Sequence, residues 1–255
     1  QFERGRRSGD FMRSADNADV SDAGTPRRRQ GWAKRLGGTQ MRGLFALDDG
    51  SALVADYNQL CRLTYEEGQL TKQALMAELH PGAEISYTAT PAGVYLTDGY
   101  GLWVLRGGAV ARATMDAPTA PGLSASAGGS LPGGLYQVVC TFERHDGTQS
   151  CASVSVQADV PDGGILNIHL PTTTQPLTAW VNVFVSPVNG DALFLAERLP
   201  IGTTSTTLYV PPEQGGRCMT LHMAPMPAGH IVRQHQGKLL VARGAAVFTS
   251  QPYAY

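Results

Sequence analysis

The chain lacks the features that would place it across a membrane or on a secretory route. None of its 255 residues fall in an apolar run of about 18, which a membrane-spanning helix would require. The opening Gln1-Phe2-Glu3-Arg4 is polar and contains no apolar segment of a secretory signal. It also lacks an initiator Met, so we expect that this end of the chain has been trimmed.

Charge is scarce as well. Charged residues make up 16% of the sequence, below the roughly 25% usual for soluble proteins. The formal net charge of −1 gives no reason to expect nucleic acid or an anionic membrane as the general partner. An apolar fraction of 42% is nevertheless ample for a core, and the length allows one large β domain or two ordinary ones.

Cysteine is rare, and its spacing contains no C-x-x-C pair and no metal-ligand pattern; the four residues are Cys61, Cys140, Cys151 and Cys218. Cys140 and Cys151 flank a predicted hairpin turn at Asp146-Gly147, so a cross-strand disulfide is one interpretation. We favour the other, in which all four are small, buried and reduced in a protein assembled in a cytosol.

Recognisable catalytic and metal motifs are also missing, including G-x-S-x-G, the G-x-x-x-x-G-K-[ST] phosphate loop and H-E-x-x-H. His230 and His235 lie five positions apart on a predicted strand, so they would point to opposite faces. Asp16, Asp19 and Asp22 recur every third residue, unlike the alternating calcium loop, and a turn-rich segment explains them. We therefore predict no catalytic, cofactor-binding or metal residues, no cofactor, and a chain that is not an enzyme.

A glycan-cleaving enzyme stays open as an alternative, because a pair of catalytic carboxylates is defined by its spatial separation. The S-x-D-x-G-x-x-W box of sialidase-type propellers is absent, however. Trp32, Trp103 and Trp180 could stack on sugars, but each lies in or beside an apolar strand, where core packing is favoured.

What the sequence does contain is internal repetition. Three segments share a strand, a tight turn ending in Gly, and an apolar strand stopped by a charged residue, with a further apolar strand after it: residues 43–56, 87–98 and 230–243. The glycines supply the positive φ that such a turn needs. Gly50 and Gly93 lie 43 residues apart, a spacing within the range of propeller blades. The repeats predict blade-like units over residues 37–116 and again over 213–255.

Between these units the chain has room for an inserted domain. The separation between Gly93 and Gly237 exceeds the length of one repeat by roughly 100 residues. This excess is close to the size of an immunoglobulin-like sandwich. A Pro/Gly/Ser-rich stretch from residue 117 leads into short alternating strands, such as the segment at 181–185 with its valines on one face. These features predict a β-sandwich over residues 117–212.

The first 36 residues differ from the rest, with weak periodicity and many turn formers. They predict an extended N-terminal arm or a strand–turn–strand at the edge of the fold. The basic triplet Arg27-Arg28-Arg29 is interpreted as a solvated face, with contact to an acidic neighbouring subunit or to passing DNA as the functional alternative.

Three stretches of the chain resemble phage structural proteins. Residues 180–190 (WVNVFVSPVNG) with 193–200 (LFLAERLP), and 134–142 (GLYQVVCTF), look like the fibronectin-type or Ig-like insert of phage tail proteins. The opening at 13–20 (RSADNADV) and 28–32 (RRQGW) resembles the start of a family in which an arm leads into a propeller-like body. The whole arrangement is similar to the tail nozzle, or tail tubular, proteins of short-tailed phages, although this chain is much shorter.

The resemblance implies an all-β fold: a partial β-propeller-like body interrupted by an Ig/fibronectin-III-like sandwich, with the N-terminal arm. It implies a virion structural protein of the tail, assembled in the host cytoplasm, that helps form the conduit for genome ejection. The implied partners are further copies in a homo-oligomeric ring, sixfold being favoured, other tail or head-to-tail connector proteins, and genomic DNA in passing. A host receptor- or glycan-binding adsorption module is the main alternative.

Propellers close with four to eight blades, because an open ring leaves strand edges exposed. Only three repeats are visible, and the last lies just before Tyr255. We therefore expect either that the natural chain continues past Tyr255 or that neighbouring subunits cover the open edge.

Overall fold

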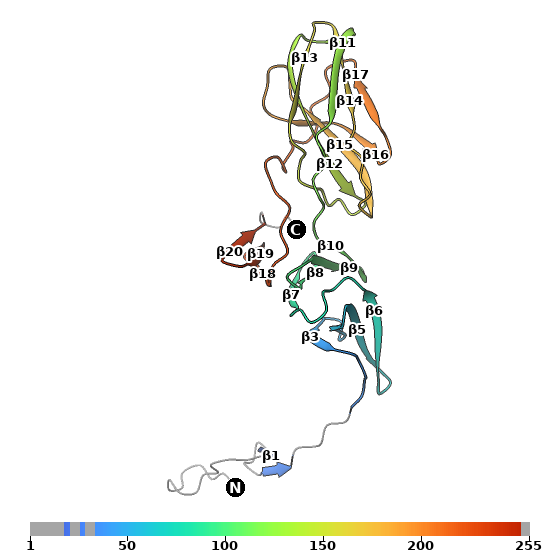
Figure 1. The fold of residues 1–255 in the computed structure, drawn as a ribbon, viewed down its shortest axis with the longest axis vertical. Coiled ribbons are helices and arrows are strands. Elements are labelled where there is room, and N and C mark those ends of the chain that lie inside the picture. Colours follow the sequence, from blue (N-terminus) through green and yellow to red (C-terminus); the bar gives the residue numbers. More distant parts are fainter. Residues whose placement is uncertain (1–17, 21–25, 29–33, 251–255) are drawn as a thin grey trace.

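The computed structural model describes residues 18–20, 26–28 and 34–250, and every regular element within them is a β-strand (Figure 1). The strands form one two-stranded sheet and five sheets of three or four strands, all antiparallel where strands pair, so the expected all-β class is confirmed. Within these residues no sheet closes on itself and no propeller ring is formed.

The N-terminal arm falls largely outside the described residues, together with Asp16, Asp22 and Trp32. The described part is a short hairpin that pairs Ala18 with Arg28 and Val20 with Pro26; its strands are β1 (Ala18–Val20) and β2 (Pro26–Arg28).

Two four-stranded meanders follow, and a three-stranded meander ends the described chain. The first comprises β3 (Met41–Ala46), β4 (Ala52–Asp56), β5 (Gln59–Glu66) and β6 (Gln69–Met76). The second comprises β7 (Ser86–Thr90), β8 (Gly93–Thr97), β9 (Leu102–Arg106) and β10 (Ala109–Arg112). The third comprises β18 (Ile231–His235), β19 (Lys238–Arg243) and β20 (Ala246–Thr249).

These three sheets coincide with the three sequence repeats, and the shared glycines have the expected backbone conformation. Gly50, Gly93 and Gly237 have φ values of 82°, 137° and 71°. L-residues rarely adopt such angles, so glycine is what lets each strand turn tightly into the next.

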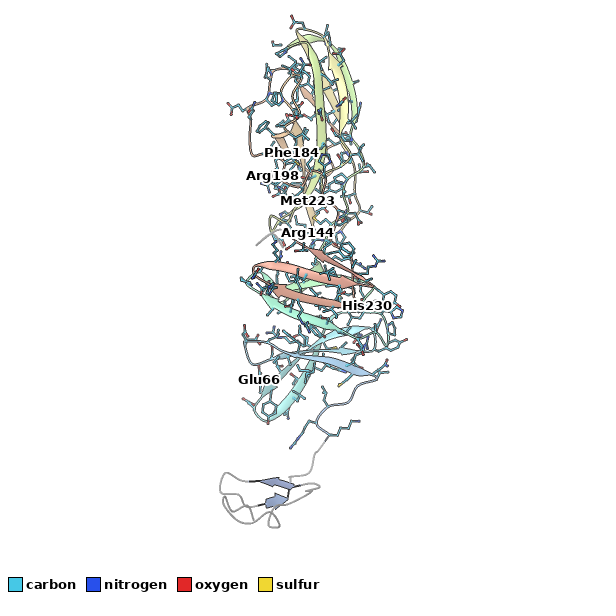
Figure 2. The ribbon with its side chains drawn as sticks, turned by 90° about the vertical axis from the view of Figure 1, so that its left-hand side faces the viewer. Glu66, Arg144, Phe184, Arg198, Met223 and His230 are labelled. Carbon is cyan, nitrogen blue, oxygen red and sulfur yellow. The ribbon has the colours of Figure 1, made fainter. Side chains whose placement is uncertain are left out.

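The three sheets are stacked, with β7–β10 in the middle (Figure 2). One of its faces packs on β3–β6 through Leu53, Leu60, Tyr87, Leu96, Trp103 and Leu105. Its other face packs on β18–β20 through Tyr95, Leu102, Val104, Val232, Leu239 and Val241. Alternation along β8 and β9 therefore supplies two cores from one sheet, because neighbouring residues point to opposite faces.

The edge strands β7 and β18 are also tied together, although they are 146 residues apart in sequence. The backbone N–H of Val232 donates to Ser86 Oγ at 3.0 Å, and that of Gln234 donates to Thr88 Oγ1 at 3.0 Å. Side-chain hydroxyls thus bridge two sheets where no ladder joins them, which fixes the third sheet beside the second.

Residues between β10 and β18 build a second unit of two facing sheets, drawn at the upper end of Figure 1. The three-stranded sheet has the order β11-β14-β17, with β11 (Gly122–Leu131), β14 (Gly164–His169) and β17 (Ser205–Leu208). The four-stranded sheet has the order β13-β12-β15-β16, with β12 (Gly134–Arg144), β13 (Val156–Val160), β15 (Thr178–Val185) and β16 (Phe194–Pro200).

One core joins the two sheets, and its largest members are fully buried. The core contains alternate residues of β12 and β15, as the valines at 181, 183 and 185 predict. These side chains pack against Leu166 and Ile168 of β14 in the facing sheet. Met115, which precedes β11, is 2% exposed and belongs to the same core.

The returning chain packs on the outer face of the four-stranded sheet. Cys218 and Leu221 join Val139, Phe184 and Leu193 in a separate small core. Backbone hydrogen bonds hold this segment to β16, from Leu195 N to Gly216 O at 2.9 Å and from Cys218 N to Leu193 O at 2.9 Å. Both connections between the sandwich and the stacked sheets are therefore packed against the sandwich itself.

Candidate functional site

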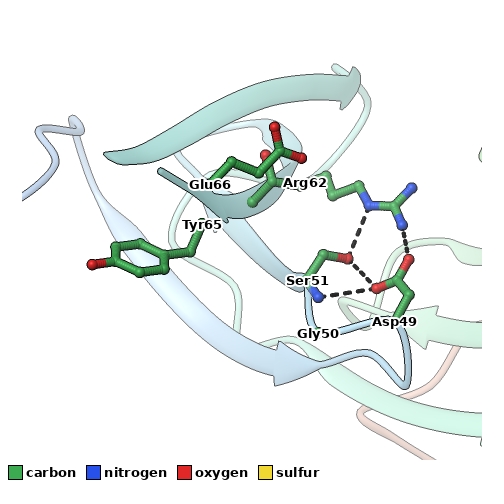
Figure 3. Close-up of a pocket in the computed structure, with 7 residues that line it drawn as sticks. Asp49, Gly50, Ser51, Arg62, Tyr65 and Glu66 are labelled. Atoms are coloured by element: carbon green, nitrogen blue, oxygen red, sulfur yellow. Dashed lines mark hydrogen bonds and ion pairs between the residues drawn. The ribbon is translucent and has the colours of Figure 1, made fainter. Parts of the chain in front are cut away.

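A polar hollow in the stacked sheets lies at the turn between β3 and β4 (Figure 3). It has a volume of about 330 Å³ and is open to solvent; its lining residues are Asp49, Gly50, Ser51, Arg62, Thr64, Tyr65 and Glu66. A second open hollow of about 340 Å³ shares Asp49 and Arg62 and extends to the β7–β8 and β9–β10 turns. The Asp49–Arg62 pair is thus the wall between the two.

The polar groups of this wall satisfy one another. Asp49 accepts hydrogen bonds from Ser51 N at 3.0 Å and Ser51 Oγ at 2.5 Å. The Arg62 guanidinium forms an ion pair with Asp49 and donates through Nε to Ser51 Oγ at 2.9 Å. The hydrogen bonds from Ser51, followed by the Arg62 charge, lower the pKa of Asp49.

Such a carboxylate is a poor acid–base catalyst near neutral pH, because it stays ionised and already accepts several donors. No imidazole or thiol lines either hollow. The arrangement is suited to fixing the β3–β4 turn against β5.

A second polar cluster lies where the sandwich meets the middle sheet. Arg106, at the end of β9, donates to Tyr95 Oη at 2.6 Å and reaches Asp146 Oδ2 and Thr148 Oγ1, each at 3.3 Å. Arg144, at the end of β12, donates to the carbonyl oxygen of Arg112 at 2.6 Å. Four hydrogen bonds thus cross the contact between the sandwich and the middle sheet, or support the side chains that cross it. We call this contact, made by Arg106 and Arg144, the arginine joint.

The joint is partly buried. Arg144 is 6% exposed, and its burial lowers the pKa of the guanidinium. Burial also works to raise the pKa of Asp146, but hydrogen bonds from Thr148 and the charges of Arg106 and Arg144 lower it on balance.

The four-stranded sheet of the sandwich carries a third polar row on its outer face. Glu143 of β12 accepts from Asn182 Nδ2 at 2.7 Å and from Arg198 Nη2 at 2.7 Å. The Arg198 guanidinium lies 4.4 Å from the centroid of the Trp180 ring, and His145 approaches the same ring edge-on at 6.5 Å. Trp180 is half-buried on this outer face and belongs to none of the hydrophobic cores, so the favoured core packing is wrong for this residue. The cation–π contact with Arg198 occupies its ring instead.

The other tryptophan and histidine candidates are separated from one another. Trp103 is buried between the first two sheets, as its apolar strand predicts, with the Arg112 guanidinium 5.6 Å from its ring. His169 ends β14, whereas His230 immediately precedes β18 and His235 ends it. Among residues 34–250, no three His, Cys, Asp or Glu side chains are grouped closely enough to hold a metal ion.

All four cysteines are free thiols, and three of them are buried. Burial raises the pKa of Cys140 to about 12 and also raises that of Cys151. The possible Cys140–Cys151 disulfide is therefore not formed in this structure.

The sequence missed the arginine joint, although it held one signal. The charged pair Glu143-Arg144 ends a long apolar run in β12. Charged side chains at the end of such a strand are placed to contact the neighbouring unit. The contacts themselves could not be identified, because Arg112 lies 32 residues before Arg144, and Arg106 lies 40 residues before Asp146, in each case on another sheet.

No helix long and apolar enough to cross a membrane occurs in the part of the chain that the structure describes. Comparison with protein-family models, with curated proteins and with solved structures finds no match for this chain.

Proposed function

We propose that this chain is a structural protein of a phage tail, of the nozzle or tube type, which assembles through contacts between subunits and helps form the conduit for genome ejection. The observation that carries the proposal is the stack of three antiparallel meanders; among the residues that the structure describes, no further sheet packs on either end of this stack. Stacked meanders of this kind are the units of a β-propeller, and they favour a partial propeller-like body.

The order of strands in the inserted unit supports an Ig/fibronectin-III-like sandwich. The sheet β13-β12-β15-β16 corresponds to the order C′-C-F-G, and the adjacent β11-β14 pair to B-E. The chain departs from that pattern in β17, which lies in the place of strand D but is the last strand of the sandwich in sequence order. A strand A beside β11 is absent from the described residues.

A rigid conduit wall needs parts that keep their mutual orientation under load. The hydrogen bonds of the arginine joint, and the packing of Cys218 and Leu221 on the sandwich, support such an arrangement. The exposed polar hollows offer no comparable arrangement for catalysis.

The test is the presence and position of the chain in purified particles of the phage that encodes it. Quantitative mass spectrometry should find a fixed copy number per particle, and antibody labelling in electron microscopy should mark the tail. Absence from intact particles, or turnover of host polysaccharide by the purified chain, would overturn the proposal.

A further inference from the structure

The arginine joint holds more positive charge than its carboxylate neutralises. Arg106 and Arg144 are both cationic, and Asp146 is the carboxylate whose charge acts on the two of them. Arg144 is 6% exposed and forms no ion pair among the described residues. Arg112, whose carbonyl oxygen accepts from Arg144, has its own partner in Glu78 at 3.3 Å. Burying a charge without an opposite charge is costly, so the surplus at this joint favours an anion.

Both guanidiniums also keep a buried donor unused. The Nε atoms of Arg106 and Arg144 are buried and have no hydrogen-bond partner in the part of the chain that the structure describes. Arg106 Nη1 lies 3.3 Å from Asp146 Oδ2 and 3.3 Å from Thr148 Oγ1, whereas a charged N–H···O bond is normally about 2.7–2.9 Å long. Asp146 therefore holds Arg106 only loosely, and buried donors of this kind are among the groups that ions pair with in proteins.

The two cations are close enough to act on each other. Burial lowers the pKa of the Arg144 guanidinium, Asp146 raises it, and the charge of Arg106 lowers it again. The two guanidiniums therefore repel each other, and an anion between them would replace this repulsion by two attractions.

Solvent reaches the joint from one side. The side chain of Arg106 is 29% exposed and that of Asp146 is 48% exposed, so both lie at the rim. Arg144 is buried deeper, where the sandwich meets the stacked sheets (Figure 2). A ligand that contacts both arginines must therefore be small.

We infer that the arginine joint binds a small oxyanion of the phosphate class, held between the guanidiniums of Arg106 and Arg144. Arginine pairs with such an anion through two parallel N–H groups, and the unused Nε donors supply one of each pair. The ion bridges the middle sheet and the sandwich, so it stabilises the contact between them. This site goes beyond the proposed function and does not depend on it.

The experiment titrates the full chain with inorganic phosphate, balanced with chloride to keep the ionic strength constant. Calorimetry follows Tm, and phosphorus NMR follows the line width of the phosphate signal. The wild type should broaden this signal and show a saturable rise in Tm of about 3–6 °C at a phosphate concentration tenfold above Kd. R106M and R144M should each weaken binding about tenfold or more, because charged hydrogen bonds are lost. R217M is the matched control, since Arg217 is exposed, and it should bind phosphate as the wild type does.

Two further variants separate binding from folding. D146N removes the carboxylate that competes for Arg106 and keeps the Oδ1 atom that accepts from Thr148 N at 3.0 Å. It should tighten phosphate binding by about threefold, which a variant that only damaged the fold could not do. R106K retains the charge but lacks the paired N–H groups, so it should weaken binding less than R106M does.

Three results would overturn the inference. An equal rise in Tm in the wild type, R106M and R144M would be the general effect of phosphate exclusion from protein surfaces. Unchanged or weaker binding in D146N would place the ion away from this joint. Displacement of phosphate by a DNA duplex, with a dependence on Arg144, would replace the small ion by nucleic acid.

Discussion

Replacing Met115 by Ala tests whether the connection into the sandwich is part of its core. Met115 is 2% exposed in the core shared by both sheets, although it precedes the first strand of the sandwich. The next residue is clamped in place, since Asp116 N donates to Gln175 Oε1 at 2.9 Å and Gln175 Nε2 donates to Asp116 O at 3.2 Å.

The magnitude follows from burial and from this clamp. Replacing a buried Met by Ala costs about 2–5 kcal/mol, and most where the surroundings cannot close the cavity. Because the clamp holds the backbone, we expect a loss of about 3 kcal/mol in the free energy of unfolding of the sandwich. With a urea dependence of about 1.5–3 kcal/mol per molar, the midpoint should fall by roughly 1–2 M.

The assay is urea unfolding of the full chain followed by tryptophan fluorescence, in which Trp180 reports on the sandwich and Trp103 on the stacked sheets. Met219→Ala is the matched control, since Met219 is 67% exposed, and it should change stability by less than about 0.5 kcal/mol. Equal midpoints for M115A and M219A would refute the placement of Met115 in the core.

Three further predictions concern charge, the joint and the thiols. The hydrogen bond from Lys72 lowers the pKa of Asp56, so the stabilisation is complete above the ordinary value of about 3.9 and is lost as pH falls through the folded one. D56N should therefore lower Tm by about 2–4 °C at pH 7, and the difference in Tm between D56N and the wild type should shrink progressively as pH falls below about 3.9; a difference that does not change with pH would contradict this. R144M should increase hydrogen exchange at the joint and broaden the size distribution in small-angle scattering, whereas R217M, at an exposed site, should do neither. Because burial raises the pKa of Cys140 to about 12, this thiol should resist labelling at pH 8 in the native chain and react after unfolding; rapid native labelling would count against its burial.

The sequence by itself determined the class of fold and the places where the chain turns. Alternation of apolar residues with a period of two defines strands, and glycine at Gly50, Gly93 and Gly237 defines their turns, because both properties are local. The three repeats and the sandwich strands could be found for the same reason. The tail function and its partners remain predictions from resemblance.

Only the tertiary structure decided which sheets meet and which side chains cross between them. Tyr95 and Leu96 are adjacent and similarly apolar, yet they enter different cores, since each faces a different neighbouring sheet. Arg106 meets Asp146 across the joint, and Val232 meets Ser86 across 146 residues. Such contacts depend on how distant strands are placed in space, and local patterns of hydrophobicity carry no record of that placement.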